Sequence, residues 1–160
     1  MSDFAASWTL SRSRFDAAIE GLNHQQLNWR LQDGVLTLAQ MAVHVAGVEV
    51  WFASQMLGES LGSEDSRLTL AATDGVVNEK PFPYSDSELT PEFVAKALQK
   101  GRDWVGRVVW NPSEEVRRRT VQSALGPVID GEGALARLGF HAGYHQGQAH
   151  ILITAPGFPR

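Results

Sequence analysis

The chain has 160 residues, a formal net charge of −4 and 43% hydrophobic residues, values that describe one ordinary globular domain, residues 1–160, with a single core. Its acidic balance argues against a general nucleic-acid surface or an anionic-membrane surface, because both need a basic footprint. The sequence contains no cysteine; a metal would therefore need nitrogen and oxygen ligands, and any thiol would have to come from a cosubstrate.

The N-terminal segment MSDFAAS carries an Asp and no basic run, so it does not predict a secretory signal peptide. Apolar residues recur from Phe4 to Leu22 at spacings of three, four or seven, which predicts a first helix over residues 3–21. Gly21 is expected to end this helix, and the following connector is expected to hold one short turn that starts at Asn23.

The second helix has a clear start. Thr37 is a good N-cap, and Gln40 three residues later completes a capping box. The helix is expected to run to about Leu57, with Gly58 just past its end. Its core stripe is apolar, and His44 lies beside that stripe.

Residues 59–89 form a connection that is long for a compact domain, with a short helix expected at 68–72. Two interpretations are open: a surface crossover, or a wall or lid over a site. A third helix is expected to begin with Thr90 as N-cap and Pro91 at its first position, and to end near Trp110.

Residues 113–130 give the weakest pattern. A short strand at 116–122 and a turn at 125–127 that leads to a second strand are expected there. The basic run 117–119 is interpreted as a solvated surface rather than an anion site. A fourth helix is expected from residue 130 or 131 to about 154; it is apolar almost all round, which is typical of a buried helix. Four helical patterns predict an all-α four-helix bundle.

The fourth helix carries His141 and His145 four residues apart. Residues i and i+4 share one face of a helix, so two imidazoles at this spacing can converge on one metal ion. The position after the first His is Ala142 rather than Glu, which excludes the metalloprotease motif of this spacing.

On nearly the opposite face of that helix lie Gly139, Gly143 and Gly147. Glycine costs up to about 1 kcal/mol relative to Ala in a helix interior, so three of them suggest a packing role. The hypothesis is that this flat face meets either a second subunit or a tightly packed local segment.

A third ligand is sought among the remaining histidines. His24 lies in a connector, and His150 is about 140° round the helix from His145. His44 is the natural partner, because metal sites in bundles are assembled from facing helices. The alternative for each histidine is a hydrogen-bonded core residue.

The two histidine motifs resemble those of the DinB-like (DinB/YfiT) superfamily of four-helix bundles. His44 and Glu49 match its H-x4-E pattern, and His141, His145 and Gln148 match its H-x3-H-x2-Q pattern. The resemblance implies an up-down-down-up bundle, frequent dimers, and a three-histidine metal site at His44, His141 and His145 with open coordination positions. It further implies thiol-dependent transferase or isomerase activity in some members.

The expected cofactor is one divalent ion, with zinc, nickel or iron favoured by all-nitrogen ligation. The leading functional hypothesis is a metal-dependent transferase that activates a low-molecular-weight thiol for transfer to an electrophile. The alternatives are a metal-dependent hydrolase, for which spacing places no acidic base beside the histidines, and a non-catalytic metal-binding or stress-response protein. Gln148 is a candidate support for His145, whereas Glu49 points elsewhere on its helix. The protein is expected to be a cytoplasmic homodimer that binds neither nucleic acid nor membranes.

Overall fold

The computed structural model of the chain describes residues 2–124 and 126–160. Its elements, in order, are α1 (Asp3–Ile19), α2 (His24–Leu27), α3 (Leu38–Leu57), α4 (Ser63–Leu70), α5 (Pro91–Val109), α6 (Glu114–Arg118), β1 (Thr120–Gln122), β2 (Val128–Asp130) and α7 (Gly131–Thr154). Among the described residues the only sheet is the antiparallel pair of β1 and β2, in which Val121 lies opposite Ile129. The chain is therefore mostly helical, which confirms the expected all-α class.

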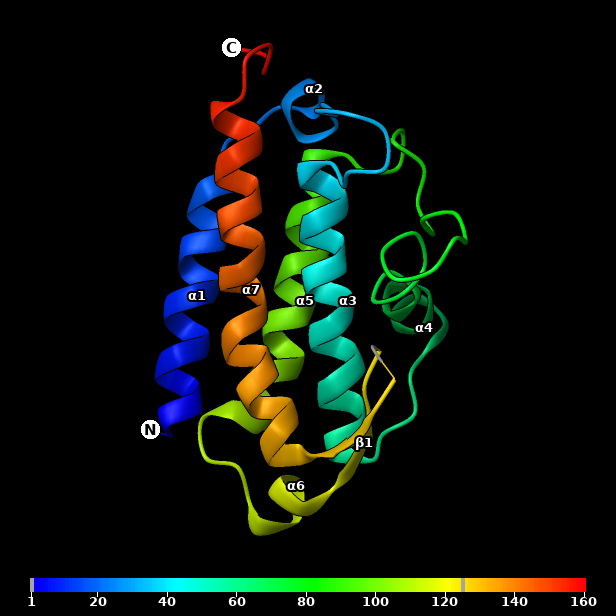
Figure 1. Cartoon of the computed structure of the whole chain (residues 1–160). Helices are drawn as coiled ribbons and strands as arrows, with labels where there is room; N and C mark the ends of the chain where they lie inside the picture. Colours follow the sequence, from blue (N-terminus) through cyan, green and yellow to red (C-terminus); the bar gives the residue numbers. More distant parts are fainter. Residues whose placement is uncertain (1, 125) are drawn as a thin grey trace.

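The long helices of the described chain, α1, α3, α5 and α7, lie side by side in Figure 1. Helices α1 and α7 both run towards the end of the molecule where α2 lies, and α3 and α5 run the opposite way. The most extensive contacts join α1 with α7 and α3 with α5. The contact between α3 and α7 brings together the two helices that carry the histidine motifs.

The predicted helix starts are confirmed by their caps. The Thr37 side chain accepts from the Gln40 backbone N–H, and the Gln40 side chain accepts in return from the Thr37 backbone. The same reciprocal arrangement begins α2 at Asn23. Helix α3 ends at Gly58, whose φ of 67° is the left-handed conformation that glycine adopts without strain.

The strand expected at 116–122 is wrong over its first half. Residues 114–118 form α6 instead, because the Ser113 side chain accepts from the Val116 N–H and Glu114 lies in the first turn, where the helix dipole favours an acidic residue. Only Thr120–Gln122 is a strand. The turn expected at 125–127 includes Leu125, which lies outside the described residues.

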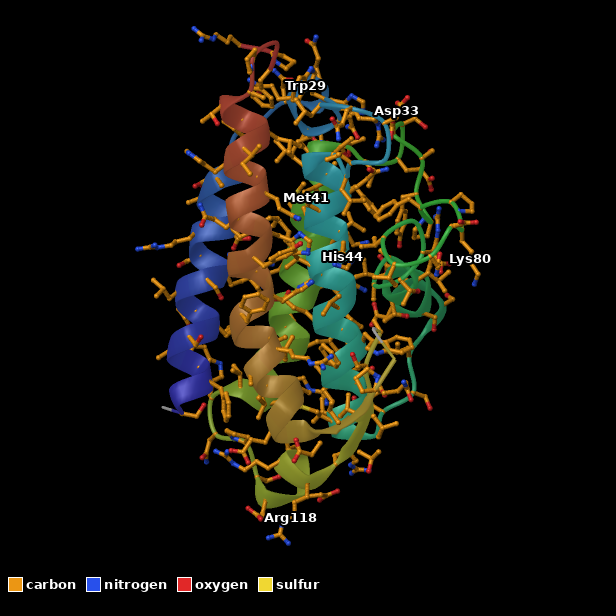
Figure 2. The ribbon with its side chains drawn as sticks, in the orientation of Figure 1. Trp29, Asp33, Met41, His44, Lys80 and Arg118 are labelled. Carbon is orange, nitrogen blue, oxygen red and sulfur yellow. The ribbon has the colours of Figure 1, made fainter. Side chains whose placement is uncertain are left out.

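The basic run at 117–119 is paired with acidic side chains. Arg117 contacts Glu132, and Arg118 and Arg119 each contact a Glu four residues earlier. Figure 2 shows Arg118, the last residue of α6, at the extremity of the molecule. The interpretation of this run as solvated surface is therefore supported over an anion site.

The short helix expected at 68–72 is longer and begins earlier, as α4. Glu64 and Asp65 lie in its first turn, where acidic side chains stabilise a helix. Its last turn packs on α3 at Gly47, where a Cβ atom would lie 2.5 Å from the Leu68 carbonyl oxygen. The absence of a side chain at Gly47 is what allows α4 to approach so closely.

The glycine row of α7 has an intramolecular partner. A Cβ atom at Gly139 would lie 2.9 Å from Ser7 Oγ, and one at Gly143 would lie 3.2 Å from Ser11 Cβ. The Ser11 hydroxyl donates to the Gly139 carbonyl at 2.8 Å. At Gly147 no such neighbour lies within 4 Å. The tightly packed local segment is thus α1, and the homodimer stays a prediction.

Helix α7 is not buried all round, contrary to expectation. Phe140, Tyr144 and Ile151 are 66%, 52% and 59% exposed, whereas α3 is buried along nearly its whole length. The apolar face of α7 is open because it borders a cavity rather than another helix. Within the described part of the chain, none of the helices combines the length and apolar character needed to cross a membrane.

Candidate metal centre

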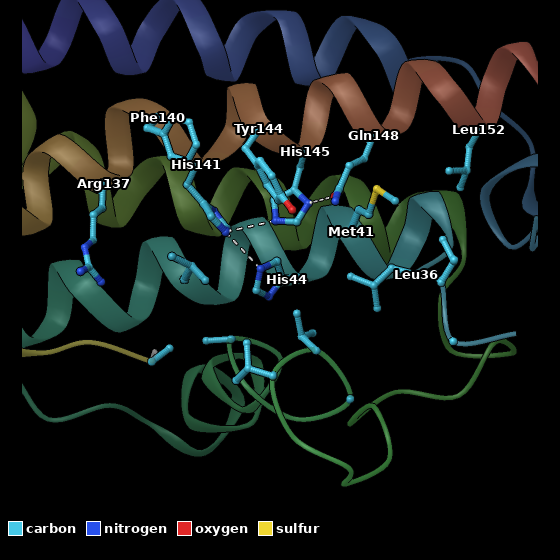
Figure 3. Close-up of a pocket in the computed structure, with 18 of the residues that line it drawn as sticks. Leu36, Met41, His44, Arg137, Phe140, His141, Tyr144, His145, Gln148 and Leu152 are labelled. Atoms are coloured by element: carbon cyan, nitrogen blue, oxygen red, sulfur yellow. Dashed lines mark hydrogen bonds between the residues drawn. The ribbon is translucent and has the colours of Figure 1, made fainter. Parts of the chain in front are cut away.

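Three histidines from two helices meet in the interior of the bundle. His44 projects from the middle of α3, and His141 and His145 project from successive turns of α7 (Figures 2 and 3). One ring nitrogen of each lies within 4.8 Å of the others. The structure therefore brings together the three residues that the sequence selects.

The spacing of these nitrogens suits a shared ion. His141 Nε2 lies 3.1 Å from His44 Nε2 and 3.2 Å from His145 Nε2. Bonds of about 2.0–2.1 Å to a tetrahedral zinc ion place two ligand nitrogens about 3.3 Å apart. Unprotonated nitrogens that face each other at this distance repel unless a proton or a cation lies between them. The residues thus fit a metal ion that binds three imidazoles.

Hydrogen bonds at the outer nitrogens fix the proton positions of two rings. His44 Nδ1 lies 2.8 Å from the Ala71 carbonyl oxygen, and His145 Nδ1 lies 2.7 Å from Gln148 Oε1. Both oxygens can only accept, so each Nδ1 must be the donor. The Nε2 lone pairs are then free for a metal, the arrangement that orients metal-binding histidines.

His141 differs from its two neighbours. Its Nδ1 is buried and has no hydrogen-bond partner among the described residues. Its Nε2 stands between the other two Nε2 atoms, as the dashed lines in Figure 3 show. Burial of the His141 ring with an Nδ1 that has no acceptor costs free energy, and coordination of a metal ion by this ring would offset that cost.

The site keeps its imidazoles neutral. Burial lowers the pKa of His44 and lowers that of His141 well below its ordinary value of 6.5. Burial, together with the charge of the neighbouring His44, lowers the pKa of His145 to about 4, against the opposing effect of the hydrogen bond that His145 donates to Gln148. At neutral pH all three rings are therefore in the form that binds a metal without first losing a proton.

The acceptor for His44 comes from a helix end. Ala71 is the C-cap residue of α4, and carbonyls at a helix C-terminus lack partners within the helix. Gly47, one turn beyond His44, lets this end of α4 lie against α3. The sequence shows no signal for this contact, because a backbone carbonyl is supplied by any residue.

The remaining histidines and the other two motif residues have different surroundings. His24 and His150 are exposed and lie outside the cluster, as expected. Gln148 contacts His145, which was its candidate role. Glu49 is 2% exposed and is engaged elsewhere. It accepts from Trp8 Nε1 at 2.9 Å and from Arg12 Nε at 3.0 Å, between α1 and α3.

The three histidines line a cavity of about 820 Å³ (Figure 3), a size typical of small-molecule sites. Its walls are α3, α7 and parts of three connections, residues 31–36, 72–77 and 123–124. The long connection of residues 59–89 therefore forms part of a wall, which supports its interpretation as a wall or lid over a site.

No Asp or Glu belongs to the lining formed by residues 2–124 and 126–160. Arg137 also belongs to this lining; it was not among the predicted site residues, although its position four residues before His141 places it on the same face of the helix.

Comparison with known proteins agrees with this arrangement. No curated protein matches the chain significantly. The family model of the DinB superfamily matches residues 7–149, a segment that contains both histidine motifs and all four long helices in whole or in large part. Since the match covers well over half of the sequence, the chain belongs to the DinB superfamily.

Proposed function

We propose that this protein is an up-down-down-up four-helix bundle that binds one divalent metal ion through His44, His141 and His145 and transfers a low-molecular-weight thiol to an electrophile. The observation that carries the proposal is the convergence of three Nε2 atoms at 3.1 and 3.2 Å spacings on the wall of a cavity. Zinc, nickel and iron are the favoured ions, because all three ligands are imidazole nitrogens.

The electrostatics support an anionic reactant at this site. Three neutral imidazoles leave a divalent ion with its full charge, and no acidic side chain of the described lining offsets it. A bound ion would lower the pKa of a thiol or a water molecule that reached it. The chain's own contribution is to orient the rings through Ala71 and Gln148 and to surround the reactants with apolar walls.

The thiol has to be a separate small molecule, because the sequence has no cysteine. The cavity volume of about 820 Å³ leaves room for a small thiol and its reaction partner. Hydrolysis is less well supported, because no Asp or Glu of the described lining could act as general base.

Metal analysis is the first test. The purified protein is expected to hold about one divalent ion per chain, and His44→Ala, His141→Ala and His145→Ala are each expected to lose it. His24→Ala and His150→Ala are matched controls outside the cluster and should keep the ion. Equal metal content in all six proteins would contradict the metal site.

Thiol turnover is the second test. Consumption of cysteine or glutathione in the presence of a reactive aryl halide or epoxide is expected to depend on the bound metal. Loss of metal in His44→Ala with unchanged thiol consumption would rule out the transferase and leave metal binding. A large fall in melting temperature with chelator, and no turnover with any thiol, would instead favour the non-catalytic role.

A further inference from the structure

Arg137 faces the same cavity as the histidines. Arg137, His141 and His145 are spaced at i, i+4 and i+8 on α7, so their side chains form one row along the helix. Figure 3 shows the Arg137 side chain extending from α7 on the same side as the two histidine rings, at one end of the cavity. A fixed positive charge thus accompanies the candidate metal centre.

Arg137 differs from the other arginines of the described chain in its surroundings. Seven others pair with carboxylates: Arg12, Arg67, Arg102, Arg107, Arg117, Arg118 and Arg119. Of the remaining ones, Arg14, Arg30 and Arg160 are exposed to solvent. Arg137 is partly buried, and its Nη1 donates to the Ser123 hydroxyl, a neutral group.

A partly buried guanidinium that has no carboxylate partner among the described residues is available to pair with an anionic ligand. The bond to Ser123 uses Nη1, and the guanidinium has five N–H donors in all. The donors that remain form the planar fork that binds a carboxylate through both oxygens. Since no Asp or Glu belongs to the described lining, the carboxylate would have to come from the ligand.

The rest of the cavity is suited to an apolar body. Five large apolar side chains that are exposed to solvent belong to its lining: Leu31, Val77, Phe140, Tyr144 and Ile151. Exposed apolar side chains gathered around one cavity mark a binding surface, whereas single ones scattered on a surface do not.

We propose that the cavity binds an organic carboxylate with an apolar body, whose carboxylate is held by Arg137 and whose body lies against the apolar side chains of α7 and the 72–77 segment. Such a carboxylate would be the organic substrate of the proposed transferase, and its role as a substrate rests on that proposed function. Binding at Arg137 itself needs no metal, so the two proposals can fail separately.

The test is calorimetric titration of the metal-free protein with octanoate and with 1-octanol, which share one apolar chain and differ in charge. Octanoate is expected to bind the wild-type protein more tightly than 1-octanol. Arg137→Gln is expected to weaken octanoate binding about 10-fold or more, the effect of losing a charge-assisted hydrogen bond. Its affinity for 1-octanol is expected to stay within about two-fold, since the apolar walls are unchanged.

Two further variants complete the design. Arg137→Lys keeps the charge and loses the fork, so octanoate affinity is expected to fall between the wild-type and Arg137→Gln values; it also serves if Arg137→Gln does not fold. Arg14→Gln removes an exposed charge outside the cavity and is expected to change nothing.

Octanoate affinity within two-fold of wild type in Arg137→Gln, or in Arg137→Lys if only that variant folds, would overturn the proposal. So would octanoate binding no tighter than 1-octanol in the wild-type protein. Metal content measured on each protein before the metal is removed separates this failure from failure of the metal site, because Arg137→Gln is expected to keep its ion.

Discussion

Gln148 and Ala71 give two of the three histidines their orientation. Each supplies an oxygen that accepts from Nδ1, at 2.7 Å for His145 and 2.8 Å for His44. A ring held in this way presents Nε2 in a single direction and needs no rotation when a metal binds. At the residue scale, the readiness of the site therefore depends on groups that would not themselves touch the ion.

Replacement of Gln148 by Leu is expected to weaken metal affinity about 10- to 100-fold, since His145 would lose the acceptor that fixes its tautomer. Competition of the protein against a colorimetric chelator measures this change. Gln146→Leu is the matched control on the same helix, because Gln146 has no part in the cavity lining. Equal affinities in the two variants would show that Gln148 does not position His145.

The metal-free protein is expected to lose stability as the pH falls from about 6.5 towards 4. The pKa of His145 is about 4 in the folded chain and 6.5 as its ordinary value, so in this window the unfolded state binds more protons and acid favours unfolding. The contribution is on the order of a few kcal/mol at neutral pH.

Urea unfolding of the chelator-treated protein at several pH values checks this expectation. His145→Leu should reduce the dependence of the unfolding free energy on pH, whereas His150→Leu, which alters an exposed ring, should not. A pH dependence that is identical in all three proteins would contradict the assignment to His145.

Close approaches of helices depend on glycine at the points of contact. Gly47 admits the end of α4 to α3, and Gly139 and Gly143 admit α1 to α7. The first of these approaches carries the Ala71 carbonyl to His44. At the element scale, the orientation of His44 in the metal centre therefore depends on how α4 packs against α3.

Gly47→Ala is expected to destabilise the fold by about 1–3 kcal/mol, because the added Cβ would lie 2.5 Å from the Leu68 carbonyl oxygen and α4 would have to shift. Metal affinity should fall as well, since Ala71 moves with α4. Thermal unfolding and chelator competition measure the two effects.

Gly147→Ala provides the contrast for that substitution. Its Cβ would meet nothing within 4 Å, so the higher helix propensity of Ala is expected to stabilise the protein by up to about 1 kcal/mol. Similar melting temperatures for Gly47→Ala and the wild type would contradict the role of Gly47.

A buried ionic network ties three of the long helices together. Arg12 of α1 donates to Glu49 of α3 and, through Nη2, to the Leu98 carbonyl of α5 at 2.8 Å. Burial raises the pKa of the Glu49 carboxyl, and Arg12 and Trp8 oppose that shift. Gly101 of α5 leaves the space that the Glu49 carboxyl occupies. At the scale of the whole molecule, Glu49 fixes how the helices assemble.

Glu49→Leu is expected to cost about 3–5 kcal/mol of stability, because it leaves the buried guanidinium of Arg12 without its partner on α3. Glu49→Gln keeps an acceptor oxygen and should cost less. Both variants, where folded, are expected to retain the metal. Urea unfolding and metal analysis decide the outcome; metal loss in a folded Glu49→Gln protein would place Glu49 in the site instead.

Local signals explain why so much of the fold could be predicted. The capping box of Thr37 and Gln40 and the N-cap at Thr90 act within one helical turn, and each is found where the sequence predicts it. The strand predicted through Val116 failed because Ser113 caps a short helix that competes with it. The residue pattern predicted a strand at this place, whereas the Ser113 cap favours a helix, and the helix is what forms.

By itself the sequence determined the helical class, the boundaries of the long helices and the three histidines that meet. The helices and the pairing of His141 with His145 follow from spacings of three to four residues, which are fixed by helix geometry. His44 was selected because metal sites in bundles use facing helices and because the motifs resemble those of the DinB-like superfamily. Only the tertiary structure decided what lies between helices: the acceptor at Ala71, the place of Glu49 in the core, and the cavity that Arg137 shares with the histidines. Such contacts join residues far apart in the chain, and no local pattern of residues encodes them.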